Sequence, residues 1–184
     1  MLISALSMTL LFGCSNGEES NVAKVNAETS EATTEVNAAT PIERVSQLSY
    51  EEAAKTIATM TDKELEDTTG DVRVERIKLM VAYAEQYATS EADSIQFAAD
   101  LINAFTDGTY LENIDNDEVV LVNVFKATIV SNTADDALVD FAKHYNDSMK
   151  NLFIEAYTVN SEIVQKNEDK MSKALQLASH ARNQ

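Results

Sequence analysis

The sequence contains little of what breaks a chain into tight turns or cross-links it. It has four glycines, one proline (Pro41) and one cysteine (Cys14) among 184 residues. So few glycines and prolines cannot build the many tight turns of a β-sandwich or β-barrel. A single cysteine excludes an intramolecular disulfide and a thiolate metal cluster, which leaves an intermolecular disulfide or a lipid attachment open.

Basic residues are also scarce. Fourteen Lys and Arg stand against 31 Asp and Glu, which gives a formal net charge of −17. A nucleic-acid binder needs positive charge to displace counterions, so we expect no nucleic-acid partner. The negative charge disfavours adsorption to an anionic membrane, and it could steer a basic protein partner toward the molecule. An acidic, solvated surface without such a role is the simpler alternative.

The residues that are plentiful favour helices. Hydrophobic residues make up 45% of the chain, an ordinary share for a globular protein. Ala, Leu, Glu and Lys are common, and all four are strong helix formers. We therefore expect an all-α fold, a helical bundle of about five to six helices with a long C-terminal helix.

The N-terminal residues are apolar and run to the only cysteine. Residues 1–12 carry no charged side chain. This stretch is too short for a transmembrane helix but is typical of the apolar region of a signal peptide. It leads into the quartet Leu11-Phe12-Gly13-Cys14. That quartet resembles the lipobox of bacterial lipoproteins, which implies cleavage after Gly13 and lipid attachment to Cys14.

Two features depart from the usual lipoprotein pattern. Phe12 is bulkier than the small residue usual at that place, and no Lys or Arg precedes Lys24. The alternative is an apolar N-terminal helix that packs in the core with Cys14 buried.

The resemblance also implies a location in the bacterial cell envelope. Ser15, rather than Asp, after the cysteine implies lipid anchoring at the outer membrane, on its periplasmic face or at the surface.

The segment after the cysteine differs in composition from both of its neighbours. Residues 15–40 are mainly Ser, Asn, Thr, Glu and Ala, without an aromatic residue, Leu, Ile or Met. Such a segment buries too little surface to offset its ordering entropy, so we expect it to be disordered. We divide the chain into a signal peptide (1–13), a lipidated cysteine with a disordered tether (14–40) and an acidic helical domain (41–184).

Capping patterns indicate where the first helices of the domain begin. Ser49-Tyr50-Glu51-Glu52 predicts a short helix that extends to about Met60. Thr61-Asp62-Lys63-Glu64 repeats the pattern and predicts a short helical turn that ends near Gly70.

Helical spacing predicts two longer helices next, one over about 71–89 and one from Ser90 to the Asp107-Gly108 stop. We expect the following residues of these helices to point inward: Ile77, Met80, Val81, Ala84, Tyr87, Ala88, Ile95, Ala98, Leu101, Ile102 and Phe105.

Residues 118–130 are apolar almost all round. Their β-branched content permits a buried strand, but no second strand is evident to pair with it, so we prefer a buried central helix. The segment is too short to span a membrane, and Asn123 and Lys126 interrupt it.

Near the C-terminus, apolar residues repeat at alternating intervals of four and three, which predicts a heptad-like seam on one long helix. The seam residues are Leu138, Ala142, Tyr145, Met149, Leu152, Ala156, Val159 and Ile163. The seam packs either within the monomer, which we favour, or in a homodimeric coiled coil. Beyond Lys166 and Lys170, a last helix folds back or continues.

Few residues offer catalytic or ligand chemistry. We interpret His144 and His180 as structural, and the sequence has no glycine-rich phosphate loop. Residues 107–118 vaguely resemble the calcium loop of an EF-hand, with Asp107, Asp115 and Glu118 as weak candidate ligands. Leu111 and Glu112 fail two of its central positions, so we favour an ordinary connection in which Asn116 or Asp117 caps the next helix. We expect no cofactor and no enzymatic activity.

These observations favour a membrane-anchored envelope lipoprotein that acts through protein–protein interaction. Its subclass could be a scaffold, an immunity or inhibitor protein, or an exclusion factor, and an acidic inhibitor would associate faster with a basic target at low salt. The alternative is a carrier that holds a small apolar ligand between helices. In a carrier, Phe97, Phe105, Phe125 and Tyr145 would line the cavity.

Overall fold

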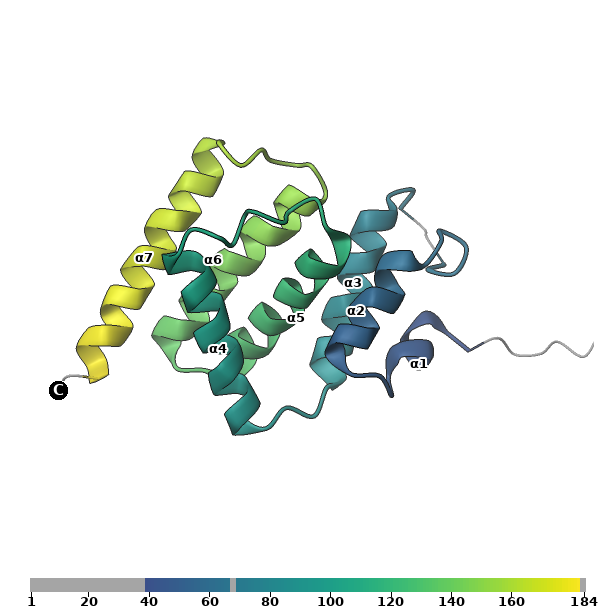
Figure 1. The fold of residues 1–184 in the computed structure, drawn as a ribbon, viewed down its shortest axis with the longest axis horizontal. Coiled ribbons are helices and arrows are strands. Elements are labelled where there is room, and N and C mark those ends of the chain that lie inside the picture. Colours follow the sequence, from purple (N-terminus) through teal and green to yellow (C-terminus); the bar gives the residue numbers. More distant parts are fainter. Residues whose placement is uncertain (1–38, 67–68, 183–184) are drawn as a thin grey trace, which may run out of the picture. The chain divides into compact units, whose positions relative to one another are not determined.

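The structure is a computed structural model that describes residues 39–66 and 69–182. Within those ranges the chain forms seven helices and no strand (Figure 1). The helices are α1 (Pro41–Val45), α2 (Tyr50–Thr59), α3 (Val72–Gln86), α4 (Glu91–Thr106), α5 (Asp117–Thr133), α6 (Asp136–Phe153) and α7 (Glu162–Arg182). The predicted all-α bundle is confirmed. The structure has more than five to six helices because α1 was not predicted and because the C-terminal seam is divided between α6 and α7. Thr40 and Glu43 form a capping box at the start of α1.

Polar side chains at the helix starts explain where the longer helices begin. In each of α2 to α6, the side chain of the N-cap residue accepts a hydrogen bond from a backbone N–H of the first turn, which otherwise has no partner. These N-caps are Ser49, Asp71, Ser90, Asn116 and Asp135. The starts predicted at Ser49 and Ser90, and Asn116 as a cap, are confirmed.

The short helical turn predicted after Thr61 forms only in part, since the N–H of Leu65 donates to the carbonyl of Thr61 at 3.0 Å but no helix follows. The N–H of Thr61 donates to Glu64 Oε2 at 3.0 Å, as the capping pattern requires. Residues 62–66 nevertheless make only turns, and Glu66 has a positive φ of 55°. Because an L-residue in the left-handed region cannot continue a right-handed helix, the segment ends there.

The centre of the fold is α5. It packs against α2, α3, α4 and α6. Its buried residues lie on all sides of the helix: Val120, Leu121, Val124, Phe125, Ala127, Thr128, Ile129 and Val130. A helix that is apolar all round can be covered on every side, so the predicted buried helix is confirmed and the strand is excluded. No helix in the described part of the chain is both long and apolar enough to cross a membrane.

The predicted long C-terminal helix is present as α7, which has 21 residues. The prediction that the seam from Leu138 to Ile163 lies on one helix is wrong, because α6 ends at Phe153. Glu155 has a φ of 57°, and the N–H groups of Ala156 and Tyr157 both donate to the carbonyl of Asn151. This left-handed ending closes α6 and lets α7 fold back against it. The seam residues up to Leu152 are buried within the monomer. Val159 and Ile163, beyond the break, are 41% and 44% exposed.

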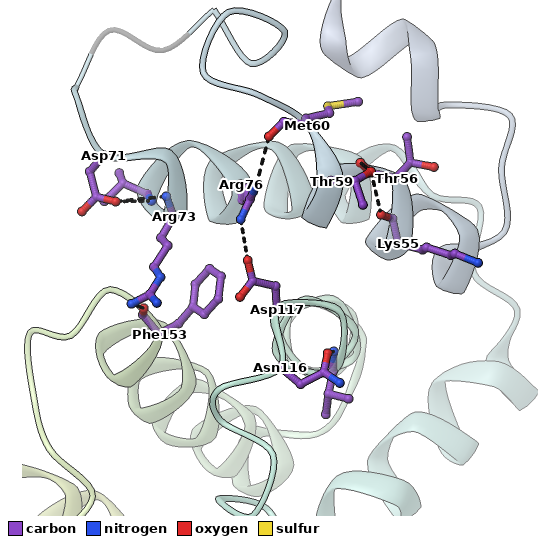
Figure 2. Close-up of polar contacts among 12 residues, drawn as sticks. Lys55, Thr56, Thr59, Met60, Asp71, Arg73, Arg76, Asn116, Asp117 and Phe153 are labelled. Carbon is purple, nitrogen blue, oxygen red and sulfur yellow. Dashed lines mark hydrogen bonds and ion pairs between the residues drawn. The ribbon is translucent and has the colours of Figure 1, made fainter.

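Two arginines of α3 connect it to other elements (Figure 2). Arg76 donates to the carbonyl of Met60 at 3.1 Å and pairs with Asp117 at the start of α5. Arg73 donates to the carbonyl of Phe153 at 3.1 Å. It also pairs with Glu155, just beyond the end of α6. These two arginines therefore hold helix ends in place.

Candidate functional site

The proposed lipidation site, Cys14, lies outside the described residues, as do the signal peptide and most of the tether. The described chain begins just before Thr40, which caps α1. Lipid attachment and the proposed location therefore stay predictions from the sequence.

The three candidate calcium ligands do not converge. Asp107 is the C-cap of α4, Asp115 lies exposed in the following turns, and Glu118 is exposed in the first turn of α5. Tyr110, between them, inserts into the core and donates to Glu168 Oε1 on α7 at 2.6 Å. Among the described residues, no group of three or more His, Cys, Asp or Glu side chains could hold a metal ion.

The two histidines lie on different helices. His180 is exposed on α7. His144 lies on α6, and burial together with the nearby Lys170 ammonium lowers the pKa of its imidazole. Its Nδ1 atom is buried without a hydrogen-bond partner in the described part of the chain. Nothing in this arrangement places a base beside a nucleophile.

The aromatic residues expected to line a carrier cavity pack against other rings. Phe125 stacks on Tyr50, with ring centroids 5.0 Å apart and planes at 3°, and Phe97 meets it edge-on at 5.8 Å. On another side of the core, Phe105 packs edge-on against Phe141 at 5.7 Å. Tyr145 packs against Phe141 at 6.0 Å. These contacts make the rings part of the core.

The feature that stands out is an apolar groove between α4 and α6. Both helices pack on α5 and touch one another little. A hollow of about 160 Å³ between them is lined by Ile95, Ala98, Ala99 and Ile102 of α4 and by Leu138 of α6. It shares three of these residues with a hollow of about 430 Å³ at the first turns of both helices. We call the combined depression the α4–α6 groove.

The position of Ile95 differs clearly from the prediction. It is 64% exposed, although the helical spacing placed it in the core. Ala98 and Leu101, from the same predicted face, are buried at 8% and 1%. The apolar arc of α4 is therefore wider than the surface that α5 and α6 cover, and the excess lies in the groove.

Side-chain hydrogen bonds fix the closed end of the groove. The hydroxyl groups of Ser94 on α4 and Thr133 at the end of α5 are 2.5 Å apart, and Thr133 also bonds to the carbonyl of Ile129 at 2.8 Å. At the start of α6, Asp135 Oδ1 accepts from the N–H of Leu138 at 3.0 Å. The walls are held in place, so the groove is preformed.

The part of the chain that forms the groove, from α4 to the start of α6, contains almost no basic residues. From residue 79 to residue 142 the sequence has one basic residue, Lys126, and twelve Asp or Glu, a net charge of 1 − 12 = −11. These 64 residues, which include α4, α5 and the start of α6, thus carry most of the net charge of −17. The other basic residues precede or follow this span.

The one cation in this span is already neutralised. Lys126 Nζ lies 2.6 Å from Asp100 Oδ2 and is within about 6 Å of the Tyr50 and Phe97 ring centres. Burial alone would raise the pKa of Asp100, but hydrogen bonds from Lys126 and Gln96 lower it below its usual value. The remaining negative charge of this span is therefore not compensated by a lysine of the span itself.

In comparisons with known protein families, curated proteins and solved structures, the chain has no significant match. Function is therefore inferred from the residues of the groove, because a fold class alone does not imply one.

Proposed function

We propose that the protein is a lipid-anchored bacterial envelope protein that works by binding another protein through the α4–α6 groove. The observation that carries this proposal is the exposure of Ile95 at the head of an apolar stripe on a preformed surface. A large apolar side chain that stays exposed at the edge of an apolar hollow offers a contact to a partner. Ile95 is exposed and can enter a pocket of a partner, and the small side chains of Ala98 and Ala99 leave space for a side chain of the partner.

The anchor part of the proposal is supported by the sequence alone. Residues 1–12 are typical of a signal peptide, and the quartet before residue 15 resembles a lipobox. Replacing Cys14 by Ser should abolish incorporation of labelled palmitate and release the protein from membranes. Wild-type chain that takes up no palmitate would contradict the anchor.

The binding part is tested by affinity capture with the full-length chain from mild-detergent extracts of the cells that produce it. The test variant is Ile95→Asp. The matched control is Ile163→Asp, which makes the same change at another exposed isoleucine in the first turn of α7. A protein retained by the wild type and the control, but lost with Ile95→Asp, supports the proposal. Identical sets of captured proteins for all three would overturn it.

A further inference from the structure

We propose that the occupant of the α4–α6 groove is a basic amphipathic helix of the partner, and this rests on the proposed function. Such a helix would carry an apolar stripe at positions i, i+3 or i+4, and i+7, flanked by Lys or Arg. Neither the exposure of Ile95 at the groove nor the shortage of basic residues between positions 79 and 142 has a role in the fold as described.

The shape of the groove fits a helix. Ile95, Ala98, Ala99 and Ile102 follow the same i, i+3, i+4, i+7 spacing along α4, a length of about 10 Å at 1.5 Å per residue. A partner helix presents apolar side chains at the same interval, so one of them can enter the recess above the two alanines. An added β-strand does not fit, because both walls are helices whose backbone groups are already bonded.

The negative charge at the rim of the groove favours a partner with positive charge. Glu91 and Asp135 line the groove, and the exposed Asp136 is the next residue, in the first turn of α6. In the described part of the chain, neither Glu91 nor Asp136 accepts a capping bond or forms an ion pair. Lys or Arg flanking an apolar stripe would meet these carboxylates, and the long aliphatic stems of both side chains can lie along the groove edge.

The same charge argues against other occupants. In a symmetric dimer formed through this groove, Glu91 and Asp136 of one copy would face carboxylates of the other copy, and these like charges would repel. The chain's own residues 15–38 contain one lysine and five glutamates, and therefore have the wrong sign. An anionic membrane surface is repelled for the same reason.

The test uses the full-length chain and a fluorescent peptide of about 14 residues, or roughly four helical turns, with leucine on one face and lysine on the other. A shuffled peptide of the same composition has the same charge without the apolar stripe. Fluorescence anisotropy should show the amphipathic peptide binding at least about tenfold tighter than the shuffled one, and more weakly as salt rises. Equal binding of the two peptides overturns the inference, because charge alone would then explain it.

Variants locate the binding site. Ile95→Asp should weaken binding of the amphipathic peptide at least about tenfold, whereas Ile163→Asp should leave it within about twofold. The double variant Glu91→Gln, Asp136→Asn retains the apolar stripe and should lower both the affinity and its salt dependence. Equal losses for both aspartate variants, or a wild-type dimer in sedimentation that Ile95→Asp dissociates, would overturn the inference.

The two proposals fail separately. If the envelope protein is captured through Ile95 but the basic peptide does not bind, the groove binds a partner of another kind and this inference is wrong. If the peptide binds through Ile95 but capture is the same for all variants, the inference about groove chemistry stands and the proposed function fails.

Discussion

Ile95 and Leu101 lie on the same helix and belong to the same apolar arc, yet they differ most in exposure, at 64% and 1%. Leu101→Ala should lower the free energy of unfolding by about 2–5 kcal/mol, because a cavity adds to the lost transfer energy. Ile95→Ala should change it by no more than about 0.5 kcal/mol. Chemical denaturation of both variants measures this difference. A loss of several kcal/mol for Ile95→Ala would mean that it is covered and that the groove is closed.

The exposure of Ile95 shows what helical spacing can and cannot predict. Spacing identifies which side of α4 is apolar, and Ala98 and Leu101 are buried as predicted. It does not say how much of that side a neighbour covers, which depends on how closely α6 approaches α4. The groove could therefore not be predicted, although the absence of Lys and Arg between residues 79 and 125 was visible in the sequence.

Among the helices, the end of α6 can be tested by whether a substitution there raises or lowers the stability of the protein. Glu155 has a φ of 57°, which favours glycine, and its contact with Arg73 involves a side chain that is 76% exposed. Glu155→Gly should therefore stabilise the protein by about 0.5–1 kcal/mol. If α6 instead continued through residue 155, the same change would destabilise it by about 1 kcal/mol. Thermal unfolding of this variant distinguishes the two.

The Thr61–Glu64 capping bonds should make the stability of the protein depend on pH. Bonds from the backbone and side chain of Thr61, and then from Arg44, lower the pKa of Glu64 from 4.5 to about 2. A carboxylate whose pKa is lowered by folding stabilises the folded state above its unfolded pKa, and that stabilisation is lost as pH falls through the folded value. Between about pH 5 and about pH 2, the melting temperature of the wild type should therefore fall more than that of Glu64→Gln.

The control for this pH dependence is Glu112→Gln, which changes an exposed glutamate in the connection between α4 and α5. It should follow the wild type, since relief of the general negative charge affects both proteins alike. A Glu64→Gln variant with the same acid sensitivity as the wild type would show that the Thr61–Glu64 bonds contribute no measurable stability.

The helix starts were more predictable than the ends. Ser49, Ser90 and Asn116 act through their own side chains on backbone groups a few residues away, so the signal is local in the sequence. At Glu66 and Glu155 the chain turns in the left-handed region without a glycine. A glutamate does not indicate such a turn in the sequence. The seam was therefore predicted to continue on one helix to Ile163, whereas α6 ends at Phe153.

For the whole molecule, the all-α fold follows from composition and from the apolar character of residues 118–130, and the structure confirms both. A chain that begins at Ala39, and so retains the Thr40 cap, should keep the melting temperature of a chain that begins at Ser15 within about 4 °C, because residues 15–38 supply no large apolar side chains for a core. Differential scanning calorimetry of both chains measures this. A larger fall would show that the N-terminal segment stabilises the helical domain.

In our proposal, the α4–α6 groove is where this protein meets its partner. The most direct measurement places the photoreactive residue benzoylphenylalanine at position 95 of the full-length chain in living cells, with the same substitution at position 163 as the control. After irradiation, position 95 should give a discrete cross-linked band that contains a second protein, and position 163 should not. No cross-link at position 95, or the same bands from both positions, would contradict the account.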